Sequence, residues 1–204
     1  MSTLQVNTIS ESTSNSGVTV DGALIKDGKI AGSAGGGLVY LGGATSGTVG
    51  SISVNSVFSS AYLNYKIMLN VDTTNSTTTQ MQMVMRASSS DTTSNYIGVR
   101  QFANVGNSNV AHASSTGTSE WYIGDISSTN PNRSSADITV FKPNLAAPTN
   151  FVSNGAGSYS SDWYLQQCYG VQTDSTQFDG FTILPINGSH TFVATYRVYG
   201  MVDS

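Results

Sequence analysis

Two histidines and two pairs of acidic residues are the side chains of this sequence that could do chemistry. A metal site needs several ligands close together, but no carboxylate lies at a useful spacing from His112 or from His190. We therefore interpret both as ordinary surface or loop histidines. A homotrimer could also gather three copies of either histidine around its axis and hold an ion there, and the sequence favours neither of the two.

Paired carboxylates are the second candidate chemistry, because a glycosidase needs two of them about 5–9.5 Å apart across a sugar cleft. Glu120 and Asp125 form one pair, and Asp174 and Asp179 form the other. On a strand, the odd spacing places Glu120 and Asp125 on opposite faces. The sequence has neither a phosphate-binding loop nor the coil repeat that is typical of β-helical depolymerases. We predict that the chain is not an enzyme and needs no cofactor or metal.

Two aromatic pairs, Trp121-Tyr122 and Trp163-Tyr164, are the positive indication of binding. Each pair lies in a predicted strand, where successive side chains point to opposite faces, so one ring of each pair should face outward. Aromatic faces stack on the C–H surfaces of sugars. All four residues are therefore candidate glycan contacts. The alternative is that each Trp packs in the core and each Tyr lies at the surface.

Charge and cysteine content limit the classes of partner. Only 10% of the 204 residues are charged, against about 25% in typical globular proteins. The Lys and Arg residues are scattered, so we expect no nucleic-acid partner. No apolar run approaches the ~18 residues of a membrane span, and the first residues do not resemble a secretory signal. Cys168 is the single cysteine, which excludes an intrachain disulfide and indicates a buried structural thiol.

Residues 51–204 contain a series of short segments that alternate between apolar and polar residues. In one of them Met81, Met83 and Met85 share a face and should point into a core. Turn signals, such as residues 153–158, separate the segments. The pattern predicts an all-β, antiparallel β-sandwich of the jelly-roll type. The predicted strands are residues 51–58, 65–71, 78–87, 96–102, 110–114, 120–126, 136–141, 149–153, 161–171, 180–184 and 192–201.

Residues 1–30 form very short strand-like segments that have too few apolar side chains to bury a core alone. Asp21-Gly22 and Asp27-Gly28 are turn dipeptides. Such a segment gains stability only when identical copies bury their apolar side chains against one another, which predicts an intertwined homotrimeric stem. The alternative is a disordered tail. The predicted trimer interface consists of Leu4, Val6, Ile9, Val18, Val20, Leu24, Ile25 and Ile30.

Residues 31–50 are rich in glycine and predict a hinge between the stem and the sandwich. A short strand, residues 38–41, lies inside this segment. The predicted organisation is thus a stem at 1–30, a hinge at 31–50 and a β-sandwich head at 51–204.

The segment TISESTSNSGVTVDGALIKDG, residues 8–28, resembles the N-terminal module of tail-fibre and related virion proteins of marine and freshwater bacteriophages, cyanophages among them. Residues 58–69, 181–185 and 196–201 are similar to the beginning and end of the β-sandwich modules of such fibres. The resemblance implies a homotrimeric virion protein that joins other virion proteins through its N-terminus. Its head would contribute to recognition of host cell-surface polysaccharide. Alternatives are a capsid decoration or vertex fibre, a neck or baseplate protein, and a glycan-degrading tailspike.

Overall fold

The computed structural model describes residues 18–20, 23–26, 29–31, 37–73, 79–104, 106, 109–126, 134–159, 162–186, 188 and 190–202. It divides into two compact units, of which Leu38–Met201 is the larger. The smaller unit comprises the residues up to Gly37 and those from Val202 onward.

The smaller unit contains a three-stranded antiparallel sheet in the order β1 (Val18–Val20), β2 (Ala23–Lys26) and β3 (Lys29–Ala31). Val18 pairs with Ile25, and Ile25 pairs with Ile30, so these residues form one row across the sheet. Val20 and Leu24 also lie in its strands. The other predicted interface residues, Leu4, Val6 and Ile9, lie outside the described residues.

The larger unit is all-β with antiparallel sheets, as predicted, and its described residues contain no helix. One sheet has eight strands in the order β10-β9-β14-β13-β12-β6-β16-β4, and the other follows the order β11-β7-β15-β5, with β8 paired to β7. The strands are β4 (Leu38–Thr45), β5 (Ile52–Val54), β6 (Asn64–Thr73), β7 (Thr79–Ala87), β8 (Ser90–Asp91), β9 (Tyr96–Asn104), β10 (Asn109–Thr118), β11 (Trp121–Ile126), β12 (Ser134–Phe141), β13 (Thr149–Tyr159), β14 (Asp162–Gln172), β15 (Gly180–Pro185) and β16 (Phe192–Met201).

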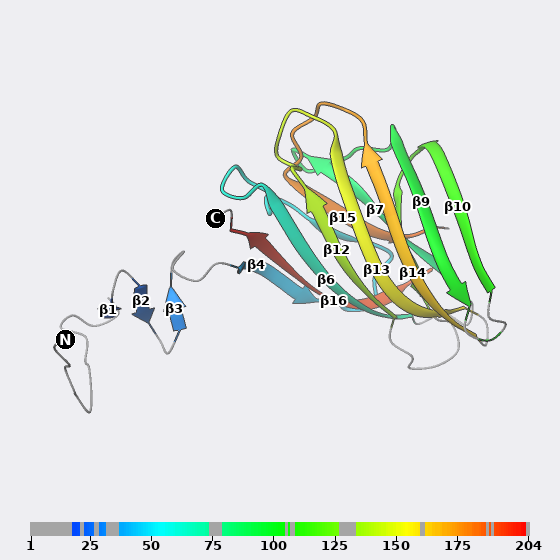
Figure 1. The fold of residues 1–204 in the computed structure, drawn as a ribbon, viewed down its shortest axis with the longest axis horizontal. Coiled ribbons are helices and arrows are strands. Elements are labelled where there is room, and N and C mark those ends of the chain that lie inside the picture. Colours follow the sequence, from blue (N-terminus) through cyan, green and yellow to red (C-terminus); the bar gives the residue numbers. More distant parts are fainter. Residues whose placement is uncertain are drawn as a thin grey trace. The chain divides into compact units, whose positions relative to one another are not determined.

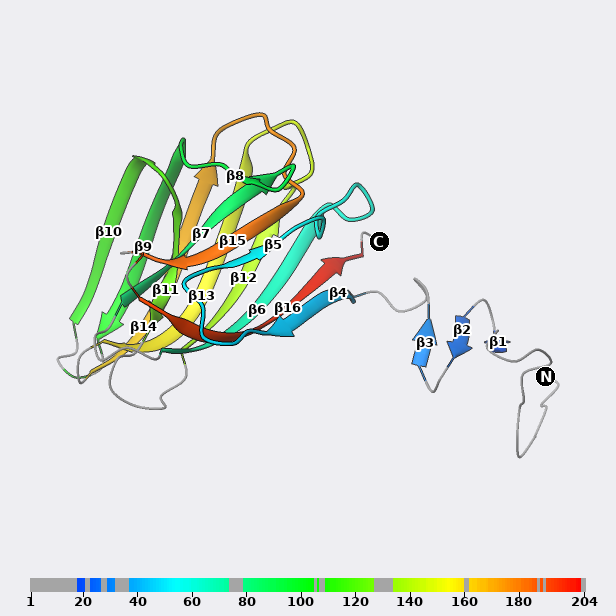
Figure 2. The same cartoon turned by 180° about the vertical axis from the view of Figure 1, so that it is seen from behind.

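The two sheets lie face to face, with the eight-stranded sheet in front in Figure 1 and the smaller sheet in front in Figure 2. The core fills the space between them. The prediction for β7 is confirmed, because Met81, Met83 and Met85 are all buried there. Such burial of alternate apolar side chains from two facing sheets is the main stabilising contribution to a sandwich.

The short strand predicted at residues 38–41 is confirmed as part of β4, but the sandwich begins before the boundary predicted at residue 51. β4 pairs with β16 along Leu38–Thr45, and Val49 forms a bridge with Phe192, so residues 38–50 belong to the sandwich. Gly43 serves close packing here, whereas a Cβ added at Gly42 or Gly47 would meet nothing within 4 Å. A Cβ added at Gly43 would lie 2.4 Å from the Tyr196 carbonyl oxygen, so only glycine fits this approach of the two strands.

The turn predicted at residues 153–158 was also wrong, because β13 continues through it to Tyr159. Its glycines face β11 and β12. A Cβ at Gly157 would lie 2.3 Å from the Asp125 carbonyl oxygen, and one at Gly155 would lie 2.9 Å from the Ser135 carbonyl oxygen. Glycine within a strand often marks such a close backbone approach rather than a turn.

Candidate functional site

The candidate functional site is the side of β10, β9, β14 and β13 that points away from the core, which we call the outer face. Side chains alternate along each strand, so every second residue belongs to this face. In β9, Tyr96 is buried whereas the next residue, Ile97, is exposed. Residues that pair directly across an antiparallel ladder point to the same side. The register of the ladders therefore arranges the side chains of the outer face in rows that cross the strands.

One of these rows consists of polar side chains. His112 of β10 pairs with Gln101 of β9, Gln101 with Gln167 of β14, and Gln167 with Asn154 of β13. All four residues are exposed, and we call them the polar row. The hydroxyl of Tyr169, one row away, donates a hydrogen bond of 3.2 Å to Gln167 Oε1.

Apolar side chains lie on both sides of the polar row. Val99 and Tyr169 occupy the row on one side, and Val110 and Leu165, which are 79% and 55% exposed, occupy the row on the other. A hollow of about 480 Å³ borders Val99 and Tyr169. A second hollow, of about 350 Å³, borders Leu165 together with Gln101, Gln167 and Asn154. Clustered apolar exposure of this kind marks interaction surfaces.

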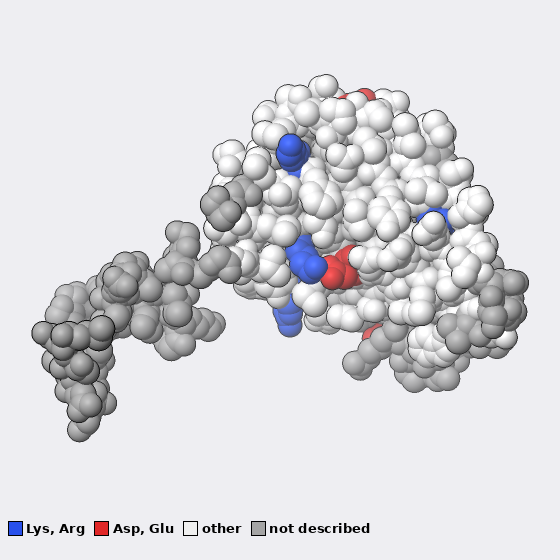
Figure 3. Space-filling view, in the orientation of Figure 1, with Lys and Arg blue, Asp and Glu red and all other residues white. Residues whose placement is uncertain are grey.

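The outer face has little formal charge. In the rows through Ile97, Val99, Gln101 and Ala103, no described side chain of these four strands is Asp, Glu, Lys or Arg. Figure 3 shows this side of the sheet, where most blue and red side chains lie toward the left, a further blue patch lies toward the right in the area of β9, and the surface over β13 and β14 is white. The Lys66–Asp137 ion pair, 2.8 Å long, belongs to β6 and β12.

A charged pair lies beneath the outer face, between the sheets. Nη1 of Arg100, in β9, is 3.5 Å from Oδ1 of Asp125, in β11, and the two side chains are 18% and 3% exposed. The Arg100 guanidinium also lies over the rings of Tyr122, at 4.3 Å, and Phe102, at 4.8 Å. Gln166 Nε2 donates a hydrogen bond to Asp125 Oδ2. Burial raises the pKa of Asp125 to about 6, against the opposite effects of Arg100 and of the Gln166 bond.

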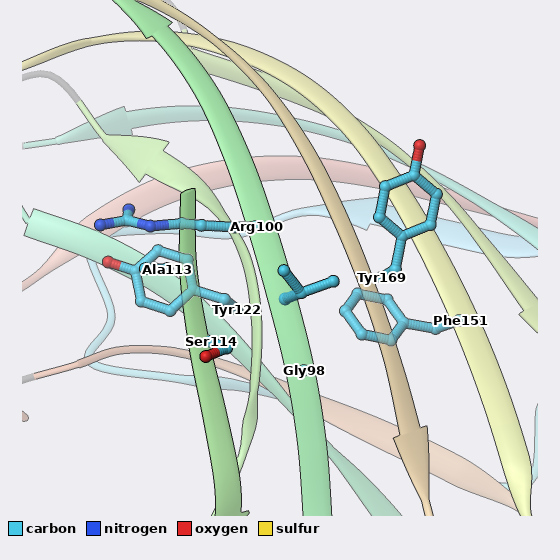
Figure 4. A pocket seen from close by; sticks show the side chains of 8 residues that line it. Gly98, Arg100, Ala113, Ser114, Tyr122, Phe151 and Tyr169 are labelled. Carbon is cyan, nitrogen blue, oxygen red and sulfur yellow. The ribbon is translucent and has the colours of Figure 1, made fainter. Parts of the chain in front are cut away.

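A cavity of about 150 Å³ is lined in part by Arg100 of this pair (Figure 4). In the figure, the side chains of Arg100 and Tyr122 lie on one side of Gly98, and those of Tyr169 and Phe151 lie on the other. The cavity is small, and Arg100 is already committed to Asp125 and two rings. We therefore assign the pair a supporting role, since it holds β9 against β11 beneath the polar row. The lining consists of Gly98, Val99, Arg100, Ala113, Ser114, Tyr122, Phe151 and Tyr169.

The aromatic pair at residues 121–122 does not lie on the outer face, contrary to the glycan-contact hypothesis. Trp121 is 1% exposed and stacks on Phe151 with a centroid distance of 4.4 Å, so its burial contradicts a role in contacting glycan. The alternative, a Trp packed in the core, is what the structure shows. Tyr122 is half-buried and faces Arg100, which places its ring against that guanidinium rather than on the outer face.

The aromatic pair at residues 163–164 has the opposite arrangement. Trp163 is 45% exposed and lies on the same side of β14 as Leu165 and Gln167. Tyr164 is half-buried, and its hydroxyl accepts a hydrogen bond of 2.9 Å from Asn104 Nδ2. Trp163 is therefore the residue of the four candidates that extends the outer face.

The outer face contains residues that the sequence reasoning missed, namely Tyr169, Gln101, Gln167 and Asn154. A signal for two of them was present, because Gln167 and Tyr169 follow Trp163 at even spacing within one predicted strand. No signal in the sequence could link them with Gln101 and Asn154, since β9 and β13 are joined to β14 only through the ladder register.

The remaining candidate groups have local roles. Glu120 accepts a hydrogen bond from Gln82, Asp174 from Asn95, and Asp179 from the Ser88 amide. No group of three or more His, Cys, Asp or Glu suited to a metal ion occurs among the described residues.

Cys168 is buried, as predicted. Desolvation by that burial raises the pKa of its thiol to about 12, so the thiol stays protonated and unreactive at neutral pH.

The described part of the chain contains no helix of the length and hydropathy that a membrane crossing requires. Comparison with protein-family models, with curated proteins and with solved structures finds no match.

Proposed function

We propose that this chain is a structural protein of a bacteriophage virion, a short homotrimeric tail fibre whose head contributes to recognition of host-surface glycan. The observation that carries the proposal is the outer face, where a polar row without Asp, Glu, Lys or Arg lies between exposed apolar side chains. Sugars present hydroxyl groups beside C–H surfaces. A surface that alternates amide and apolar side chains is complementary to both.

The N-terminal residues support the fibre part of the proposal. Residues 8–28 resemble the attachment module of phage fibres, and the register of β1, β2 and β3 aligns Val18, Ile25 and Ile30 in one row. Three copies of this sheet would form the intertwined stem by burying these residues together with Leu4, Val6, Ile9, Val20 and Leu24. The stem would then join other virion proteins, and the antiparallel head would be a jelly roll.

Trimeric assembly would suit weak binding at each head. Three heads per fibre, and several fibres per particle, raise the effective concentration of a second site once the first is bound. A shallow, open face such as this one binds a single ligand weakly, and valency compensates for that weakness.

Mass measurement tests the assembly. Light scattering on the purified full-length chain should give three times the chain mass of 21.4 kDa. A monomer would contradict the trimeric stem.

Adsorption of phage to host cells tests the receptor role. Cells are pre-coated with purified full-length protein, and bound particles are then counted. A receptor-binding fibre should reduce adsorption in proportion to the protein added, and the same protein after heat denaturation is the control. Unchanged adsorption would contradict the receptor role.

Two further candidate functions give different results in these measurements. A capsid decoration or vertex fibre, or a neck or baseplate protein, would leave adsorption unchanged and would alter the thermal stability of the particle. A glycan-degrading tailspike would release reducing ends from polysaccharide.

A further inference from the structure

We propose that the polar row binds one uncharged, extended polysaccharide chain that runs across β10, β9, β14 and β13, with one sugar residue above each strand. This inference rests on the proposed function, because it names the class of glycan that the head would recognise. It assigns His112, Gln101, Gln167 and Asn154 as hydrogen-bonding residues and Tyr169 as the neighbouring aromatic contact.

The spacing of the row is the first argument. Neighbouring strands lie about 4.8 Å apart, so four paired residues repeat at that interval over about 14 Å. This interval is comparable with the length of one pyranose residue in an extended, equatorially linked chain. Each strand therefore offers one polar side chain per sugar, in register.

The chemistry of the row is the second argument. An amide side chain donates and accepts hydrogen bonds, as a sugar hydroxyl does, and an imidazole can do the same. Anionic glycans are instead recognised by Arg or Lys, which are absent from the described outer-face rows. Arg100, beneath the face, is paired with Asp125. The charge pattern thus favours a neutral polysaccharide.

The apolar rows supply the third argument. Tyr169 and Val99 lie on one side of the polar row and Leu165 on the other, each beside a hollow. A sugar ring placed over the polar row can turn its C–H surfaces toward these side chains. Trp163 lies two residues before Leu165 in β14 and offers a larger exposed ring.

Three of the four residues of the polar row lie on interior strands of the sheet, which holds them rigidly and lowers the entropic cost of binding. β9, β14 and β13 each have hydrogen-bonded neighbours on both sides. Beneath them, Gln166 is bonded to Asp125, and Ser153 Oγ donates a hydrogen bond of 2.9 Å to the Ile123 carbonyl. These bonds connect β14 and β13 to β11 below.

A second copy of the chain fits this surface less well. The centre of a protein interface is usually apolar, and polar groups occupy its rim. The outer face has the reverse order, with the polar row in the middle and apolar side chains on both sides. Two such faces packed together would bury amide groups that each need a partner.

Affinity electrophoresis of the full-length protein tests the inference. Native gels contain hydroxyethylcellulose or galactomannan as neutral extended probes, or alginate as an acidic one. Both neutral probes should retard the protein, and alginate should not. Retardation by alginate alone, or by none of the three, would overturn the inference.

Variants locate the site. The double substitution Gln101→Ala and Gln167→Ala removes the centre of the polar row and should weaken binding to the neutral probes at least ~10-fold. The matched control is Asn70→Ala, an exposed residue of β6 on the same side of the same sheet, which should leave binding unchanged. If the double variant melts at a lower temperature than wild type, Gln167→Glu, which keeps the side-chain shape and adds a charge, replaces it. Unchanged retardation of a folded variant would overturn the inference.

The outcomes separate this inference from the proposed function. Blocked adsorption without binding to neutral probes would leave the fibre proposal standing and remove the neutral-glycan site. Binding to neutral probes without any effect on adsorption would leave the neutral-glycan site standing and contradict the receptor role of the fibre. A shift in oligomer mass on Gln101→Ala and Gln167→Ala would instead identify the face as a contact between copies, and would overturn the inference.

Discussion

Arg100 Nη1 lies 3.5 Å from Asp125 Oδ1, and this contact joins β9 of the larger sheet to β11 of the smaller one. The Asp125 side chain is almost entirely buried. A buried carboxylate is tolerated in its ionised form only when a counter-charge and hydrogen bonds replace water. Arg100 and Gln166 supply these two replacements.

Arg100→Leu should destabilise the head by about 3–5 kcal/mol at pH 8, because Asp125 is then left buried and ionised without a counter-charge. The loss should shrink at pH 5, where the carboxyl can take up a proton. Urea denaturation at both pH values measures it. The control is Lys66→Met at the half-buried ion pair with Asp137, on the solvent side of the sheet, for which we expect a change below about 1 kcal/mol. Equal effects of the two substitutions would contradict the role assigned to the buried pair.

The titration of Asp125 should add to the free energy of unfolding of the head in mild acid. Its pKa is raised to about 6 in the folded protein, against about 3.9 in the unfolded chain. The folded state therefore binds more protons between these values, so this contribution is complete below about pH 4 and is lost as the pH rises through 6. We expect the difference in free energy of unfolding between wild type and Asp125→Asn to change by about 2 kcal/mol between pH 4 and pH 7, as measured by urea denaturation. A difference that does not vary with pH would refute the shift.

Gly170→Ala should destabilise the sandwich by about 1–3 kcal/mol through overpacking. An added Cβ would lie 2.3 Å from Phe151 Cε1 and 2.8 Å from Trp121 Cδ1, in the aromatic cluster of the core. Gly42→Ala is the matched control in another strand of the same sheet, because nothing lies within 4 Å of its added Cβ. The control should change stability by less than about 1 kcal/mol. Melting temperatures compare the two, and equal values would contradict the close contact.

Ile25→Asp should convert the full-length trimer to a monomer while the melting temperature of the sandwich stays the same. Ile25 pairs with both Val18 and Ile30 at the centre of the proposed stem interface, where a carboxylate would lose its hydration. Light scattering reports the mass. Lys26→Asp is the control and should remain trimeric, because Lys26 pairs with Lys29 and neither residue belongs to the proposed interface. A trimer that survives Ile25→Asp would place the trimer interface outside this sheet.

The local pattern of the sequence was enough to identify most strands, because alternation is a property of neighbouring residues. Phe192–Met201 was predicted with the bounds that β16 has, and the methionines of β7 point into the core as expected. The glycine-rich segments were wrongly predicted as a hinge and a turn. Gly43 and Gly157 instead allow close backbone approach of strands that are distant in sequence. Their packing partners could not be read from the residues around them.

Two Trp-Tyr pairs show where the sequence stops being sufficient. Period-2 alternation establishes that Trp and Tyr point to opposite sides, but it does not say which side is the core. Trp121 turned out to be buried, and Trp163 exposed. The polar row also depends on the tertiary structure. Only the register of four strands aligns its residues, which are His112, Gln101, Gln167 and Asn154. The sequence by itself determined an all-β chain of short alternating strands. The tertiary structure decided which faces are buried and which side chains meet, because both depend on pairing between residues far apart in the chain.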